Sequence, residues 1–343
     1  MSRPKRHHFV PRAYLARFAD NGLVVVHRRD SKIFTASPAN VAVECGFYDV
    51  ANSVSGNSSR VEEMLATIDD SAAIALRSID RTGQPPPEGT EDRQILSIYL
   101  ALQNTRTPEQ RARTMFPAQV ADYAGARELT QEVVYEFLER VHLGFAPSDN
   151  EAKAAFDFVS VALLEPKTQT AEFAIQVMLG SVKHVAPLIA AMNWTLEIDR
   201  KEQLVTSDLP FIFWRAPTIR DKFEGVGVNN AEELRFPLDP GKQLVLTKRR
   251  RTPTARITAE RARACNSDAA SACYRFIVGC PNQEAMIARL SMDKARPVVR
   301  FNTGPMYALR PDGTKEYEGE ILHIWVPRRE ARVPPSARRR RPH

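Results

Sequence analysis

Short apolar runs separated by polar residues mark the first 50 positions of the chain. Residues 23–26 and 33–35 flank the polar stretch 28–32, a pattern that predicts a β-hairpin. A further short strand is expected at residues 47–50, and Asp20-Asn21-Gly22 predicts a turn. The first part of the chain is therefore expected to contribute strands to a sheet.

The period of the apolar positions changes after residue 58. Spacings of three and four predict an amphipathic helix, and Ser59 with Glu62 has the pattern of a capping box at its start. Gly83 and the proline run 85–87 are expected to end this helix. The apolar positions on its predicted buried face are Val61, Leu65, Ile68, Ala72, Leu76 and Ile79.

Residues 90–192 are predicted to form a succession of helices, because polar caps recur ahead of apolar-periodic stretches. Thr107 is followed by Pro108 at the first helical position, where no amide hydrogen bond is lost. Pro187 is expected to kink the end of the last helix. The other predicted caps are Thr130, Ser148 and Thr170, and the helix after Thr130 is expected to bury Val134, Phe137, Leu138 and Val141.

The alternation of period two returns after residue 193. Trp194, Leu196 and Ile198 alternate with polar residues, and the polar stretch 199–203 then leads into residues 204–206, which predicts a second hairpin. Further strands are expected at residues 211–214, 244–246, 275–278, 298–301 and 321–326, helices at 258–273 and 282–292, and a turn at 311–313.

These patterns predict an α+β fold with an N-terminal β-hairpin, a helical middle region and a C-terminal mixed β-sheet with flanking helices. The expected regions are a basic N-terminal segment with the hairpin, a helical region, a mixed α/β region that packs with the N-terminal strands, and a basic disordered tail. Their predicted bounds are residues 1–55, 56–192, 193–326 and 327–343.

The positive charge is unevenly distributed. The net charge is +7, yet residues 1–17 carry five basic and no acidic side chains, and residues 327–343 carry seven arginines and one glutamate. A third basic run lies at residues 248–263, so the remainder of the chain is acidic. Clustered Arg and Lys side chains suit phosphate backbones, which makes nucleic acid the expected partner. The alternative is that the tails are solvated and favour solubility.

Four cysteines are too few for a disulfide scaffold and lack the paired spacing of a zinc ribbon. Small buried thiols are favoured over a catalytic thiol. The N-terminus has no apolar run that would indicate a secretory signal, and no stretch is expected to reach the roughly 18 apolar residues that cross a bilayer. We therefore expect a cytoplasmic protein that does not associate with membranes. The cysteines are Cys45, Cys265, Cys273 and Cys280.

A set of short motifs resembles the bacterial family called domain of unknown function 4238. It begins with the segment His7-His8-Phe9-Val10-Pro11, followed by Tyr14-Leu15 and Arg17-Phe18. Two positions depart from the usual pattern, since Arg29 replaces a tyrosine and Leu209 a polar residue. The resemblance covers roughly residues 5–280 and implies relatives without implying a chemistry. Its further segments are residues 27–30, 42–48, 61–63, 102–108, 194, 206–210 and 236–240.

Two adjacent histidines in the N-terminal basic stretch are the first candidates for chemistry. Imidazole binds transition metals and titrates near neutral pH, so His7 or His8 is a candidate metal ligand or general base. Neighbouring residues of an extended segment point to opposite faces, so one metal ion is not expected to bind both. The alternative is a structural role, in which a ring packs in a cleft and hydrogen-bonds the backbone.

The segment 206–210 places a carboxylate after an apolar strand. Asp208 could complete a divalent metal site with His8 and Glu44, or with Asp30 in place of Glu44, a mixed nitrogen and oxygen set that suits Mg²⁺, Mn²⁺ or Zn²⁺. Ser207 is expected to contact substrate. The alternative is that Ser207 and Asp208 hydrogen-bond the amides of a turn.

Four further residues are candidates for substrate binding. Gln103 and Arg106 lie near the end of a predicted helix, where Arg106 could bind a phosphate or carboxylate in a bidentate manner. Arg106 could equally close the C-terminus of that helix. Arg6 and Arg17 belong to the basic N-terminal stretch.

The function predicted from these features is a metal-dependent nuclease, a phosphodiesterase that acts on nucleic acid in bacterial defence or as a toxin. His7, His8 and Asp208 would be catalytic, with His8, Glu44 and Asp208 at the metal. The alternative is a non-catalytic module that binds nucleic acid or protein and in which the histidine motif is structural. A metal-independent transferase for a phosphorylated ligand is also compatible with the sequence.

Overall fold

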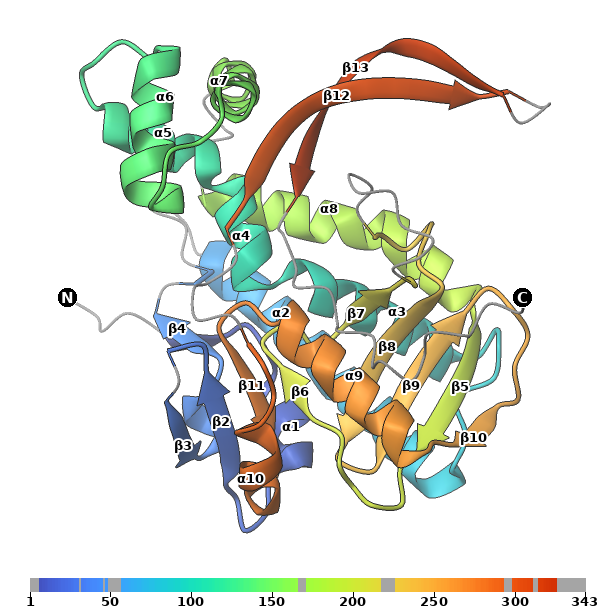
Figure 1. The fold of residues 1–343 in the computed structure, drawn as a ribbon. Helices are drawn as coiled ribbons and strands as arrows, with labels where there is room; N and C mark the ends of the chain where they lie inside the picture. The colour runs from blue at the N-terminus through green and yellow to red at the C-terminus, as the bar shows by residue number, and fades with distance from the viewer. Residues whose placement is uncertain are drawn as a thin grey trace, which may run out of the picture.

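The chain has an α+β fold, as the apolar pattern predicts (Figure 1). The predicted basic tail 327–343, the predicted turn 311–313 and the predicted helix cap Thr170 lie outside the residues that the structure describes. The computed structural model describes residues 6–30, 32–45, 47–48, 57–165, 171–216, 226–292, 298–310 and 314–325.

The N-terminal segment folds into two pairs of strands linked by a short helical turn. β2 (Val24–Arg28) and β3 (Ile33–Ala36) form the predicted hairpin, and Asp20 bridges Leu23 across the predicted turn. The first basic residues form β1 (Arg6–His8), which pairs with β4 (Val43–Cys45). The strand expected at residues 47–50 is not formed at Phe47 and Tyr48, which lie in a turn after β4. The connecting elements are α1 (Arg12–Leu15), η1 (Ala16–Phe18) and η2 (Pro38–Asn40).

Strands from both halves of the chain share one antiparallel sheet of order β3-β2-β11-β6. β11 (Phe276–Gly279) pairs with β2 on one side and with β6 (Thr206–Ser207) on the other. The hairpin predicted across residues 199–203 is therefore wrong. The chain leaves one sheet there and enters the other, because residues 204–206 find their partner in β11 and not in the preceding strand.

The middle of the chain is helical between Asn57 and Ala190. Thr107, Thr130 and Ser148 cap their helices as predicted, each accepting a hydrogen bond from the amide three residues later. Val141 was expected to be buried but is exposed, because the chain passes into a π-helix there. The elements are α2 (Asn57–Thr82), α3 (Glu91–Thr105), α4 (Pro108–Thr114), α5 (Phe116–Ala124), α6 (Gln131–Phe137), η3 (Leu138–Leu143), α7 (Asp149–Leu163) and α8 (Ala171–Ala190).

A second, mixed sheet has the order β10-β5-β9-β8-β7, with β10 parallel to β5 and the other pairs antiparallel. Helix α9 (Ala259–Ala272) lies in front of the junction between the two sheets (Figure 1). The main core joins both sheets to α2, α3 and α8. The remaining elements here are β5 (Asn193–Ile198), β7 (Ile212–Trp214), β8 (Glu233–Asp239), β9 (Lys242–Thr247), β10 (Thr254–Arg256), η6 (Pro281–Gln283) and α10 (Glu284–Ile287).

A separate smaller core lies in the lobe formed by α5, α6 and α7. The antiparallel ribbon of β12 (Arg300–Leu309) and β13 (Lys315–Trp325) inserts Phe301 into this core and then arches above α8 (Figure 1). Arg300 fixes the base of the ribbon, because its Nη2 lies 2.6 Å from Oε2 of the buried Glu151 in α7.

Helix α8 is long and apolar enough to cross a membrane by length and composition, contrary to the expectation that no stretch reaches that length. Within the described residues it is the one helix with such a window, Phe173–Ala190, of which 22% is buried. Ile175, Met178 and Ile189 contribute to the main core, so the apolar character of α8 also serves packing inside the protein. A core helix passes the same test of length and composition.

Candidate functional site

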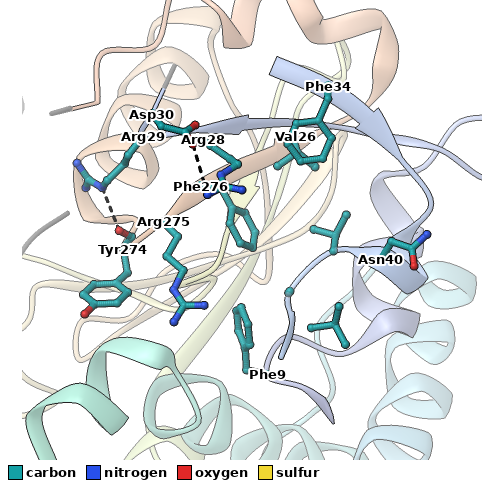
Figure 2. A pocket seen from close by; sticks show the side chains of 13 residues that line it. Phe9, Val26, Arg28, Arg29, Asp30, Phe34, Asn40, Tyr274, Arg275 and Phe276 are labelled. Atoms are coloured by element: carbon teal, nitrogen blue, oxygen red, sulfur yellow. Dashed lines mark hydrogen bonds and ion pairs between the residues drawn. The ribbon is translucent and has the colours of Figure 1, made fainter. Parts of the chain in front are cut away.

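A pocket of about 490 Å³ opens where the β1–β4 pair, the β2–β3 hairpin and the start of β11 meet (Figure 2). We call it the arginine pocket. It combines apolar walls with charged side chains from segments that are distant in the sequence. Its charged, amide and aromatic lining consists of Phe9, Arg28, Arg29, Asp30, Phe34, Asn40, Tyr274, Arg275 and Phe276.

Arg275 reaches into the pocket from the residue before β11. Its Nη1 atom lies 2.9 Å from Oε2 of Glu44, and its guanidinium carbon lies 5.6 Å from the centre of the Phe9 ring. Both Arg275 and Glu44 have side chains that are more than one-third exposed. An ion pair of this kind contributes little to stability, roughly 0–1 kcal/mol, so its arginine can exchange partners at small cost.

Arg28 is the second arginine of the pocket whose side chain is partly exposed. Its side chain is 54% exposed, and its Nη2 atom lies 3.4 Å from Oδ2 of Asp30. Arg29 differs, since it is buried and its Nε donates to the carbonyl oxygens of Cys273 and Tyr274, each at 3.2 Å. Arg29 thus supports the pocket wall, whereas Arg28 and Arg275 are available to a ligand.

Asp208 is completely buried behind this wall. Its two carboxylate oxygens accept hydrogen bonds from the backbone amides of Tyr274 at 2.8 Å and Arg275 at 2.5 Å. Burial raises the pKa of Asp208 to about 6, against the opposite effect of these amides and of Arg275. Ser207 bonds within its own turn, accepting from the amide of Leu209 at 3.1 Å. Ser207 thus makes the turn contact that was the alternative to a direct role, whereas Asp208 binds amides that lie 66 and 67 positions later in the chain.

The paired histidines have different surroundings. His7 is buried, and its Nδ1 accepts from the amide of Tyr48 at 3.2 Å while its Nε2 lies 3.7 Å from Oε2 of Glu62. His8 is half-buried, and burial lowers its pKa, although contacts with the backbone of Pro38 and Ala39 act in the opposite direction. The Nε2 atom of His8 is buried and has no hydrogen-bond partner among the residues that the structure describes.

Arg106 and Gln103 lie away from the arginine pocket, beyond His7. Arg106 is 1% exposed, and both of its terminal nitrogens bind the carboxylate of Asp69, at 2.9 and 3.1 Å. With its amide oxygen turned toward this guanidinium, Gln103 accepts from Nε at 3.1 Å. The bidentate geometry expected for Arg106 is therefore present, and its partner is a carboxylate of the protein.

Tyr14 connects the segments that carry the family resemblance. Its hydroxyl lies 2.7 Å from Oγ1 of Thr206 and donates to the carbonyl oxygen of Pro237 at the same distance. Arg17 pairs with Asp80 at 2.8 Å and with Asp239 at 3.2 Å, so it ties the same turn to α2 and β8. These contacts give Arg17 a structural role, because they connect η1 to α2 and to β8.

The structure thus divides the residues selected from the sequence into two groups. Glu44 and Asp208 both bind Arg275 at the arginine pocket, and Arg6 donates to Asn40 at its edge at 3.2 Å. His7, Gln103 and Arg106 belong to the interior network on the other side of β1. Among the described residues, no three His, Cys, Asp or Glu side chains are arranged to hold a metal ion, so His8, Glu44 and Asp208 do not form such a group as they stand.

Sequence reasoning did not select three residues that line the pocket, Arg28, Phe34 and Arg275. The sequence pattern places Arg28 within a motif, Phe34 in a strand and Arg275 at the start of another strand, and it indicates no role for any of them. A phenylalanine on a predicted hairpin whose polar stretch begins with two arginines was the available signal for Phe34 and Arg28. Arg275 could not be found in this way, because β11 joins β2 from 250 positions later in the chain.

A buried charged cluster between α9 and the mixed sheet was also missed. Arg235 binds Glu233 at 2.6 Å and Asp268 at 2.5 Å, and its guanidinium carbon lies 4.4 Å from the centre of the Trp214 ring. Arg261 of α9 reaches Glu233 at 2.8 Å. Every charge is matched by one of opposite sign, which indicates a role in fixing α9 on the sheet.

Fold and site together define an α+β protein with an arginine-rich pocket built from both halves of the chain. A family model described as protein of unknown function, domain of unknown function 4238, matches residues 6–283. The chain therefore belongs to this family, as its N-terminal motifs indicate. No curated protein and no solved structure matches the chain.

Proposed function

We propose that this protein binds single-stranded nucleic acid in the arginine pocket. The observation that carries the proposal is the exposed ring of Phe34, which shares the pocket with Arg28 and Arg275. Phe34 is 42% exposed, so part of its ring is open to a stacking partner. Proteins that bind single strands combine cations for the phosphates with aromatic rings on which bases stack.

The charge arrangement supports a phosphate ligand. Arg28 and Arg275 are paired only weakly, with half-exposed Asp30 and Glu44, and a phosphate offers each arginine a stronger bidentate partner. Arg6 adds a third cation at the rim, next to Asn40. A pocket of about 490 Å³ falls in the usual range of about 300–1,000 Å³ for small-molecule sites and accommodates one nucleotide.

The first prediction concerns the two arginines. The double variant Arg28→Gln/Arg275→Gln is expected to bind a fluorescein-labelled 20-nucleotide DNA or RNA strand at least about tenfold more weakly than the wild type. The slope of log K against log salt is expected to decrease by about 1–2, because two phosphate contacts are lost. Phe34→Ala is expected to weaken binding by about 1–3 kcal/mol through lost stacking. Fluorescence anisotropy between 50 and 200 mM salt measures all three values.

Lys183→Gln is the matched control, since this lysine is exposed on α8 away from the pocket. It is expected to bind as the wild type does. Equal binding by the double variant and by Lys183→Gln would show that the basic runs bind nucleic acid without the pocket. Absence of binding by the wild type to either strand would remove the proposal.

The second candidate function is metal-assisted cleavage of nucleic acid held in the same pocket, with Mg²⁺, Mn²⁺ or Zn²⁺ as cofactor. It rests on one observation, that Arg275 brings together two of the acidic residues selected for the metal, Asp208 through its amide and Glu44 through its guanidinium. A metal ion at Glu44 would have to displace this guanidinium. His8 lies on the strand that pairs with β4, and its lowered pKa keeps the imidazole neutral and able to accept a proton near pH 7.

Cleavage is tested by incubating the purified protein with single- and double-stranded DNA and RNA in the presence of each metal. Under this second function, product appears with the wild type and decreases at least about a hundredfold in His8→Ala and Glu44→Gln. These two variants are chosen because their side chains are partly exposed, so folding is retained. Lack of product with every metal and substrate leaves binding without catalysis as the function.

A further inference from the structure

A second cleft, of about 250 Å³, lies between α1–η1, α2 and α3 and shares no lining residue with the arginine pocket. We call it the tyrosine cleft. Tyr14 and Tyr99 line its aromatic part, and small or aliphatic side chains such as Ala13, Ala73 and Leu76 line the rest. The alanines among the lining residues come from α1–η1 and from α2, and their small side chains occupy little of the cleft.

Tyr99 provides the donor of this cleft. The residue is 2% exposed, and its hydroxyl makes no hydrogen bond with any described residue. The hydroxyl of Tyr14, in contrast, is occupied by Thr206 and Pro237. Burial raises the pKa of Tyr99 far above its usual value, so the phenol remains protonated and able to donate. A phenol that lines a cleft and has no protein partner for its hydroxyl is a position for a ligand acceptor.

The charged residues of the cleft favour an anion. Asp69 is bound by both terminal nitrogens of Arg106, and Arg17 is paired with Asp80 and Asp239. Arg77 is exposed at the lining and makes no ion pair with the described residues. The carboxylate of Asp69 is thus already neutralised by Arg106, whereas the guanidinium of Arg77 at the rim has no opposite charge beside it among the described residues.

We propose that the tyrosine cleft binds a small organic anion with one flat apolar ring, such as an aromatic carboxylate. The ring lies against the alanine and leucine side chains, Arg77 supplies the opposite charge, and the Tyr99 hydroxyl donates to a carboxylate oxygen. This site is independent of nucleic-acid binding in the arginine pocket.

The test is isothermal titration of the full chain with benzoate and with benzylammonium, which share a ring and differ in charge. Benzoate is expected to bind and benzylammonium is not. Arg77→Gln and Tyr99→Phe are each expected to weaken benzoate binding about tenfold, the effect of one hydrogen bond to a charged group. Ala73→Leu, which fills the cleft from α2 with a good helix former, is expected to abolish binding.

Controls separate this proposal from others. Arg28→Gln/Arg275→Gln is expected to bind benzoate as the wild type does, since those arginines line the other pocket. Thermal unfolding checks that Ala73→Leu remains folded. If it does not fold, Arg77→Gln still tests the proposal, because Arg77 is exposed and its substitution should not affect folding. The proposal would be overturned if benzoate does not bind at about 10 mM, a concentration at which a ligand of millimolar affinity is still detected. Equal binding of benzylammonium, or unchanged benzoate binding by Arg77→Gln and Tyr99→Phe, would also overturn it.

Discussion

Replacing Arg235 with methionine is expected to lower the free energy of unfolding by about 3–5 kcal/mol. The guanidinium lies in the buried cluster beneath α9, where it binds Glu233 and Asp268 and packs over Trp214. Methionine keeps the volume but leaves Asp268 buried with no ion-pair partner among the described residues. Removal of one member of a buried ion pair is costly because the remaining charge is not compensated.

Urea unfolding measures this effect, and a double variant shows its cause. Adding Asp268→Asn to Arg235→Met removes the uncompensated charge and is expected to restore about half of the loss. Arg263→Met is the control, because Arg263 is exposed on α9, the helix that carries Asp268, and makes no ion pair with the described residues. A loss below about 1 kcal/mol for Arg235→Met would mean that the cluster is solvated and does not fix α9.

The same cluster is expected to make stability depend on pH. Burial would raise the pKa of Glu233, but Arg235 and Arg261 outweigh it and hold this pKa at about 2. Because the pKa is lower in the folded protein than in the unfolded chain, the stabilisation is complete above about pH 4.5 and is lost as the pH falls toward 2. Glu233→Gln is therefore expected to cost about 2–3 kcal/mol at pH 6 and much less near pH 2, measured by urea unfolding at each pH.

Asp208→Ala is expected to lower the free energy of unfolding by about 3 kcal/mol. The substitution leaves the amides of Tyr274 and Arg275 buried without an acceptor, and each lost bond to a charged acceptor contributes about 1.5–3 kcal/mol. Part of this loss is offset, because the buried carboxylate itself is costly near neutral pH. Benzoate binding in the tyrosine cleft is expected to persist, since Asp208 does not line that cleft.

Asp208→Ala also distinguishes the two interpretations of the segment 206–210. A structural carboxylate predicts a less stable protein whose arginine pocket is loosened, because Arg275 is held by this bond. A catalytic carboxylate predicts full stability and loss of nucleic-acid cleavage. Unfolding free energy and cleavage are measured on the same preparation, and unchanged stability would contradict the structural role.

Several elements fixed by local interactions were predicted correctly from the sequence, whereas the capping box expected at Ser59 was wrong, because α2 begins at Asn57. The caps at Thr107, Thr130 and Ser148 are contacts over three residues, and the β2–β3 hairpin joins neighbours in the chain. The hairpin expected after β5 was wrong because β6 pairs with a strand 70 residues later. β8 was missed although Leu234, Phe236 and Leu238 alternate with polar residues, because Pro237 interrupts the run and proline argues against a central strand.

The candidate site was predictable only in part for the same reason. The sequence selected Glu44 and Asp208, and both meet at Arg275, but it could not select Arg275 itself. The sequence pattern also could not separate a bidentate arginine that faces a ligand from one that faces its own chain. Arg106 is of the second kind, since Asp69 reaches it from α2, across 37 positions.

The central position of β11 has a consequence for synthesis of the protein. β2 and β3 emerge early from the ribosome, but their sheet lacks its third strand until Gly279 has been translated. A nascent chain therefore holds an open strand edge through most of its elongation, and such edges invite pairing with other chains.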